Sequence, residues 1–168
     1  MKPVKFLKSQ MKIAPLIGRG DYEGAIRILE GELTGTADDA LYLEMIAHWH
    51  WIAGNHEKAI ETAKKALSLD PTSFDMPRIL SQIYAKREEH EQAAAYVKIG
   101  LNNYPAENLQ APPAWAFGVL KFVGKFSARW KRIEEAANED LKDPDKDRRE
   151  WNAWAKQYVA WYEASVRK

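Results

Sequence analysis

The sequence predicts an all-α protein built from stacked pairs of helices, and three observations favour this fold class. Three successive segments of the 168-residue chain align at a constant spacing, with positions 20, 54 and 88 equivalent. Within each segment, apolar residues recur at helical spacing. Hydrophobic residues make up 46% and charged residues 29% of the chain, which is ordinary for a globular protein and excludes a wholly disordered one.

The repeated register extends along each segment and needs no insertion. A turn residue is followed at fixed intervals by small or apolar residues, and prolines close the second and third segments. The equivalent positions are Gly20, Gly54 and Glu88; Ala25, Ala59 and Ala93; Leu29, Ala63 and Val97; Leu33, Leu67 and Leu101; and Pro71 and Pro105.

Each segment is typical of a helical hairpin, most clearly the second. Thr36 with Asp39 three residues later indicates a helix start. Gly54 is expected to end this helix and Asn55 to cap the next one, which Asp70-Pro71 then ends. Because one hairpin cannot bury both of its apolar faces, neighbouring hairpins must stack.

Two prolines bear on the helices of the other segments. Pro15 is expected to interrupt the first helix, where Lys12 also falls in a slot that should be apolar. Pro77 lies in the first turn of its helix, where a missing N–H costs little, and Asp75 is expected to cap that helix.

The segments resemble the tetratricopeptide repeat (TPR) family, whose pattern is W-x2-L-G-x2-Y, then A-x3-F, then P. In the second segment the matching positions are Leu43, Ile46, Ala47, His50, Ala59, Ala63 and Pro71. The resemblance covers about residues 6–105. It implies a right-handed α-solenoid of three helix-turn-helix repeats, at about 6–39, 40–73 and 74–107, in a region spanning 1–105.

Residues 106–168 form a different, tryptophan-rich region, expected to contain two capping helices. One helix is expected from 114 to about 141 and the other from about Lys146 to Val166. In the last helix, aromatic residues at spacings of three and four share one face. They either pack on the Trp115–Phe126 helix and close the open end of the solenoid, or form an aromatic surface for a partner. The residues of this C-terminal surface are Trp115, Trp151, Trp154, Tyr158 and Trp161.

Composition and motifs exclude several classes of function. The chain has no cysteine, so thiolate metal sites and cysteine nucleophiles are impossible. A net charge of +1 argues against a nucleic-acid-binding protein. No motif of nucleotide binding or hydrolysis occurs, and His48 and His50 point in different directions on a helix, so they cannot share a metal. We therefore expect no enzyme, no cofactor and no metal.

The expected binding surface follows from the resemblance, since the first helices of successive TPR units line a concave groove. Gln10, Ala14 and Ile17 are weaker candidates from the first unit, and the Asn of the chaperone-tail carboxylate clamp is missing. The alternative is that these positions are only solvated. The groove residues are Leu41, Glu44, His48 and Trp51 in the second unit and Asp75, Arg78, Gln82 and Lys86 in the third.

The sequence thus predicts a non-enzymatic TPR adaptor or assembly factor that binds a protein or peptide in its groove. One alternative is a self-assembling structural protein, a homo-oligomer formed through the aromatic C-terminal helices. Another is a peripheral membrane protein that uses residues 114–132 as an amphipathic helix on an anionic surface. The N-terminus has no continuous apolar run that would form a secretory signal, so a cytoplasmic location is expected.

Overall fold

The computed structural model describes residues 3–103 and 146–167, and every regular element in these ranges is a helix, which confirms the predicted all-α class. The predicted connector at 106–113, the predicted helix at 114–141 and its Trp115 lie outside the described residues. The last helix has the predicted bounds. The elements are α1 (Pro3–Ile17), α2 (Tyr22–Glu30), the short 3-10 helix η1 (Ala37–Asp39), α3 (Ala40–Ile52), α4 (His56–Leu69), α5 (Asp75–Lys86), α6 (His90–Asn103) and α9 (Lys146–Val166).

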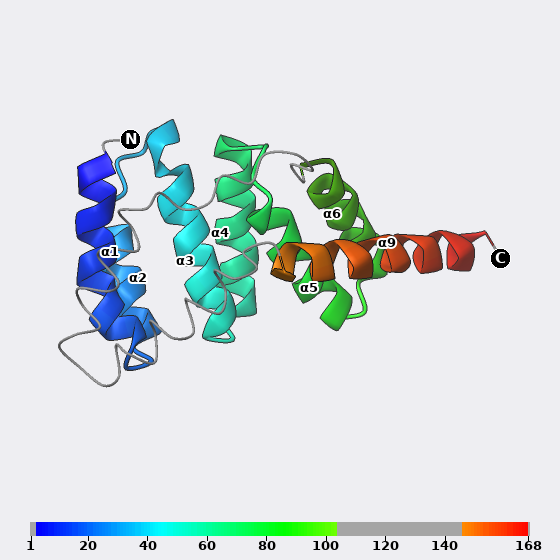
Figure 1. The fold of residues 1–168 in the computed structure, drawn as a ribbon, viewed down its shortest axis with the longest axis horizontal. Helices are drawn as coiled ribbons and strands as arrows, with labels where there is room; N and C mark the ends of the chain where they lie inside the picture. The colour runs from blue at the N-terminus through cyan, green and yellow to red at the C-terminus, as the bar shows by residue number, and fades with distance from the viewer. Residues whose placement is uncertain (1–2, 104–145, 168) are drawn as a thin grey trace. The chain divides into compact units, whose positions relative to one another are not determined.

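Helices α1 to α6 form three successive pairs, α1–α2, α3–α4 and α5–α6 (Figure 1). Each helix packs on the next one along the chain, so that α2 contacts α3 and α4 contacts α5 across the pair boundaries. In addition, α3 contacts α5, which brings the first helices of the second and third pairs together. This adjacent packing is that of a TPR-like helical repeat.

The turn inside each pair has the same backbone conformation. The φ angle is +78° at Gly20, +79° at Gly54 and +61° at Glu88. These three residues occupy the equivalent positions of the sequence repeat, so the register read from the sequence corresponds to a repeated structure. Glutamate at the third position is unusual, because a residue with a Cβ rarely adopts a positive φ.

The buried core consists of two clusters that follow the pair boundaries. Ala47, Ala59 and Ala63 are fully buried, and their small side chains allow the close approach of α3, α4 and α5. The first cluster joins the first and second pairs and contains Ile13, Ala25, Ile26, Leu29, Tyr42 and Ile46. The second joins the second and third pairs and contains Leu43, Ala47, Ala59, Ala63, Ala66, Met76, Ile79, Leu80, Ile83, Tyr84 and Ala93.

Two predictions about α1 and α5 are wrong. Helix α1 continues through Pro15 to Ile17, since a proline in the last turn removes one hydrogen bond without breaking the helix. Helix α5 begins at Asp75 itself, so this residue is not the cap. The Ser73 hydroxyl accepts the hydrogen bond from the Met76 N–H at 3.4 Å, as a cap would.

Capping at the second pair also differs from the prediction. Asn55 stands at the N-cap position of α4, but its side-chain amide donates to the Glu23 carboxylate of α2 at 2.9 Å and makes no capping bond. Thr36 likewise makes no side-chain capping bond. Asp21, by contrast, caps α2 by accepting from the Gly24 N–H at 2.8 Å. Asn55 therefore links the first and second helix pairs and does not cap α4.

Asp39 organises the turn that leads from α2 into α3. Its carboxylate is buried, with 5% of the residue exposed. It accepts hydrogen bonds from the Thr34 N–H at 2.9 Å and the Thr34 hydroxyl at 2.9 Å, and from the Gly35 N–H at 2.6 Å. Asp39 thereby fixes the start of α3, the helix that carries half of the expected groove residues.

The chain divides into two compact units, and α9 contributes to both. The first unit comprises Met1–Tyr104 and Tyr158–Lys168, and the second comprises Pro105–Gln157. Within the first unit, the Tyr158 hydroxyl lies 2.7 Å from Nδ1 of His90 on α6, and Glu163 pairs with Lys98 at 2.8 Å. The second half of α9 therefore packs on α6 through side chains.

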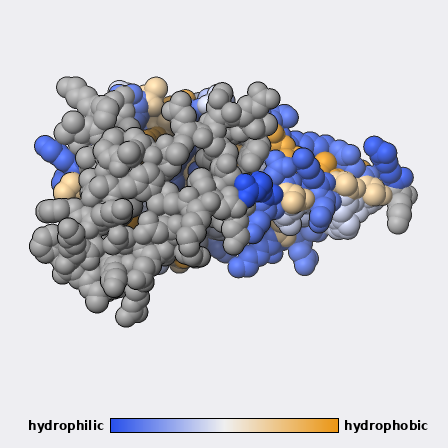
Figure 2. All heavy atoms as spheres, in the orientation of Figure 1, coloured by the Kyte–Doolittle hydropathy of each residue, from blue (hydrophilic) through white to orange (hydrophobic). Residues whose placement is uncertain are grey.

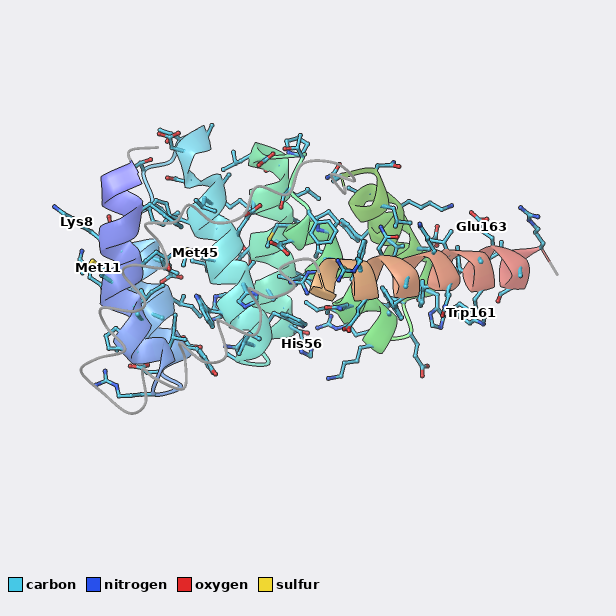
Figure 3. All side chains as sticks on the ribbon, in the orientation of Figure 1. Lys8, Met11, Met45, His56, Trp161 and Glu163 are labelled. Carbon is cyan, nitrogen blue, oxygen red and sulfur yellow. The ribbon has the colours of Figure 1, made fainter. Side chains whose placement is uncertain are left out.

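The aromatic residues of α9 differ in exposure. In the first unit, Tyr158 packs against the core cluster of the second and third pairs. Trp161, which is labelled in Figure 3, is 50% exposed and contacts the His90 ring edge-on. In the second unit, Trp151 is buried and its ring lies 6.4 Å from that of Trp154. The visible described surface around the end of α9 is mostly hydrophilic with scattered apolar residues (Figure 2).

Candidate functional site

A cleft of about 250 Å³ lies between α3 and α5 in the first unit. Five of the groove residues expected from the sequence line it, and Met45, Trp49 and Met76 line it as well. The expected groove residues in the cleft are Leu41, Glu44, His48, Asp75 and Arg78.

Helical periodicity explains why these side chains meet. Positions 41, 44 and 48 recur at three and four residues along α3, as positions 75 and 78 do on α5, so each set shares one face of its helix. The buried residues Leu43 and Ala47 lie between these positions on α3, and buried Ile79 follows Arg78 on α5; all three belong to the core. Core packing therefore holds the two polar faces next to each other.

Arg78 is engaged on both sides within the site. Its Nε donates to the Asp75 carboxylate at 3.2 Å. Its guanidinium carbon lies 5.7 Å from the centre of the Trp51 ring, a cation–π arrangement. Trp51 does not line the cleft but packs on the core beside it. The positive charge of Arg78 is thus already compensated by the Asp75 carboxylate and the Trp51 ring.

Glu44 is in a different electrostatic situation. Burial raises the pKa of its carboxyl, and the negative charges of Asp75 and Asp70 raise it further, while a hydrogen bond from Ser73 acts in the opposite direction. Among the residues that the structure describes, no Lys or Arg forms an ion pair with Glu44. Its carboxylate is therefore poorly compensated when ionised.

Aromatic rings form one end of the cleft. The His48 ring meets Trp49 edge-on with centroids 5.1 Å apart, and Trp49 stacks on Tyr22 of α2 at 5.7 Å. Burial lowers the pKa of His48 and the nearby Arg78 lowers it further, while Asp75 opposes this. His48 is therefore held neutral more strongly than an ordinary histidine.

The comparison with protein families bears on the segment that contains α3. The tetratricopeptide repeat family model matches residues 40–73. This segment is therefore similar to a tetratricopeptide repeat. It has the bounds expected for the second repeat and contributes Leu41, Glu44 and His48 to the cleft. No curated protein is significantly similar to the chain.

The match to the TPR family supports a general class of function. TPR units generally bind other proteins and generally have no catalytic activity, so the repeat indicates a role in protein interaction. In the described part of the chain, no group of three or more His, Asp or Glu side chains is placed to hold a metal ion. None of the described helices is long and apolar enough to cross a membrane.

The remaining groove residues of the TPR prediction lie outside the cleft. Gln82 is half-buried, and its side-chain oxygen has no hydrogen-bond partner among the described residues. Lys86 is exposed at the end of α5. In the first pair, Gln10 donates to the sulfur of Met45 at 2.8 Å, so it contacts the wall of the cleft, whereas Ile17 packs in the core. Ala14 is half-buried.

Three cleft residues were not identified from the sequence. Trp49, Met45 and Met76 stand next to groove positions on their helices, and no pattern distinguishes them from core residues. Figure 3 shows Met45 projecting from α3. Their apolar surface widens the site beyond the polar face that periodicity predicts.

A second, wider cleft of about 450 Å³ lies on other faces of the second and third pairs. It contains the ion pair between Arg87 and Glu57, with 2.5 Å between nitrogen and oxygen, and Lys64 lies 5.6 Å from the centre of the Tyr84 ring. Arg87, Glu57 and Lys64 are therefore each engaged by a neighbouring side chain. Its other lining residues are Ile60, Glu61 and Glu89.

Proposed function

We propose that this protein is a non-enzymatic adaptor or assembly factor that binds a linear segment of a partner protein in the cleft between α3 and α5. The observation that carries the proposal is that Leu41, Glu44, His48, Asp75 and Arg78, chosen from the repeat alone, line one cleft. A cleft that combines apolar walls with a few fixed polar groups is suited to side-chain recognition.

The arrangement of Arg78 supports binding over simple solvation. Arg78 is half-buried and held between the Asp75 carboxylate and the Trp51 ring, so its guanidinium has a fixed position in the cleft. A fixed guanidinium loses little conformational freedom when a partner binds, which favours affinity. The eight groove residues of the sequence prediction are proposed as the contact surface, with Gln82 and Lys86 at its periphery.

The test uses a library of random linear peptides selected on the full-length protein. Selected peptides should bind the wild type and lose at least about tenfold in affinity to a Trp51→Ala, Arg78→Ala double variant. Arg87→Ala is the matched control, because it removes the same residue type from the other cleft and should leave affinity unchanged. Circular dichroism and urea unfolding verify that the variants are folded.

Equal affinity of the selected peptides for the wild type and the double variant would remove the cleft from the proposal. Arg78→Gln alone provides a second variant, since it keeps Trp51 in the core. It should also weaken binding relative to the Arg87→Ala control.

A second candidate function is self-association through the end of α9. It is favoured by Trp161, which is half exposed on the surface of the first unit, and by Val166, which is 65% exposed. Sedimentation at several protein concentrations tests it, with Trp161→Gln as the variant. A monomer at all concentrations would exclude this function.

A further inference from the structure

The charges of the cleft between α3 and α5 do not balance. Arg78 and Asp75 compensate each other, and His48 is held neutral by its surroundings. Glu44 remains, with a hydrogen bond from Ser73 as its compensation within the described residues. The lining of the cleft therefore carries one surplus negative charge, at a half-buried position where water compensates it incompletely.

The surroundings of Glu44 are apolar and aromatic. Leu41, Met45 and Met76 supply the apolar lining, and the rings of His48 and Trp49 stand at one end. Methionine side chains adapt to irregular shapes, and aromatic rings attract cations. A ligand that matches this lining has an aliphatic part and a positive terminus.

The size of the cleft limits the ligand further. About 250 Å³ lies below the roughly 300–1,000 Å³ that is usual for sites of drug-sized molecules. A single long side chain fits such a volume better than a cofactor does. Lysine and arginine have this form, since a flexible aliphatic stem carries their charge.

We propose that the cleft receives a lysine or arginine side chain from the linear segment of the partner protein, with its cation against the Glu44 carboxylate and its stem along Leu41, Met45 and Met76. This inference rests on the proposed function and specifies its ligand class. The Asp75–Arg78 pair then forms the far wall, and it repels a second cation less than a free arginine would.

The raised pKa of Glu44 agrees with this role. The carboxyl has lost hydration and has no cationic partner among the residues that the structure describes, and a bound lysine or arginine would supply one. A half-buried carboxylate without a cationic partner discriminates more strongly between cationic and neutral side chains than an exposed carboxylate does, because an exposed ion pair is screened by water and salt.

The experiment compares peptides that differ at one side chain. A peptide from the library selection is made with lysine, arginine or neutral norleucine at its basic position and titrated by fluorescence anisotropy. Each peptide is measured on the full-length wild type, on Glu44→Gln, and on Glu61→Gln, which removes an exposed glutamate in the other cleft and serves as the control.

On the wild type, the lysine or arginine peptide should bind at least about tenfold more tightly than the norleucine peptide, as expected for a partly buried charged contact. On Glu44→Gln the ratio should fall to near one, and on Glu61→Gln it should persist. Equal binding of the norleucine peptide to the wild type would overturn the inference, and so would a ratio that survives Glu44→Gln.

The library selection separates the two proposals. Selected peptides without a common basic residue that still depend on Trp51 and Arg78 would leave the proposed function standing and overturn this inference. Failure to select any peptide would overturn both. Glu44→Gln is nearly isosteric and removes a charge that burial disfavours, so it should fold as well as the wild type.

Discussion

The turn residue Glu88 should be a point of stored strain that glycine relieves. Its φ of +61° costs a residue with a Cβ about 1–2 kcal/mol. Glycine there would recover this amount, less about 0.4–1 kcal/mol for the greater freedom of the unfolded chain. We therefore expect Glu88→Gly to raise the free energy of unfolding by about 0.5–1 kcal/mol.

At the equivalent position of the second repeat, Gly54, we expect the opposite change in the free energy of unfolding. A methyl group at Gly54 would meet no other heavy atom of the described residues within 4 Å, so the effect of Gly54→Ala is that of the backbone alone. The φ of +79° should make this variant less stable by about 0.5–1 kcal/mol.

Urea unfolding of the full chain, followed by far-ultraviolet circular dichroism, measures both variants. Changes in midpoint at constant slope report stability. Glu88→Ala is the control, because it removes the side chain but keeps the strained backbone, and it should stay within about 0.5 kcal/mol of the wild type. If Glu88→Gly is less stable than the wild type, the repeated turn geometry cannot be the source of the strain.

Two further predictions concern charged groups. Asp39→Ala should lower the free energy of unfolding by about 2–3 kcal/mol, since it leaves the buried turn without its charged acceptor. Burial raises the pKa of Asp39, but the hydrogen bonds from Thr34 and Gly35 outweigh it and the pKa is lowered. The difference in free energy of unfolding between Asp39→Ala and the wild type should therefore shrink as the pH falls below the ordinary value of 3.8 towards the folded pKa. Urea titrations that give the same difference at every pH would contradict this. Affinity for the lysine peptide should fall on acidification from a pH above the ordinary 4.5, because the pKa of Glu44 is raised. Burial raises that pKa most, and the charges of Asp75 and Asp70 raise it further. Protonation of His48 beside Arg78 adds repulsion that also weakens binding of the lysine peptide. Calorimetric titrations that show no pH dependence would count against the role of Glu44.

The sequence was most informative where structure depends on local periodicity. The bounds of α9 follow from patterns within a few residues, and the equivalence of Gly20, Gly54 and Glu88 follows from the constant spacing of the repeat. The structure confirms both. Helix caps were less predictable. Asn55 and Asp75 are typical capping residues, but their side chains find Glu23 and Arg78 instead.

The candidate site shows the same division. The face of α3 that carries Glu44 and His48 follows from helical spacing, so the sequence places these residues together. The extent of the cleft depends on the sizes of neighbouring side chains such as Met45 and Met76, which no spacing rule predicts. Trp51 was predicted on the same face of α3 as Glu44 and His48, but its ring packs on the core beside Arg78 and does not line the cleft.

The path of the chain has a practical consequence for shortened versions of this protein. Residues 158–168 belong to the same compact unit as residues 1–104, although more than fifty residues separate them in sequence. A fragment that stops after the third repeat loses the phenol ring of Tyr158 from the surface of its core and the hydrogen-bond partner of His90. Truncation at the apparent end of the repeats would thus uncover apolar surface and promote aggregation. Joining residues 1–104 to 158–168 by a flexible linker would keep this surface covered by Tyr158.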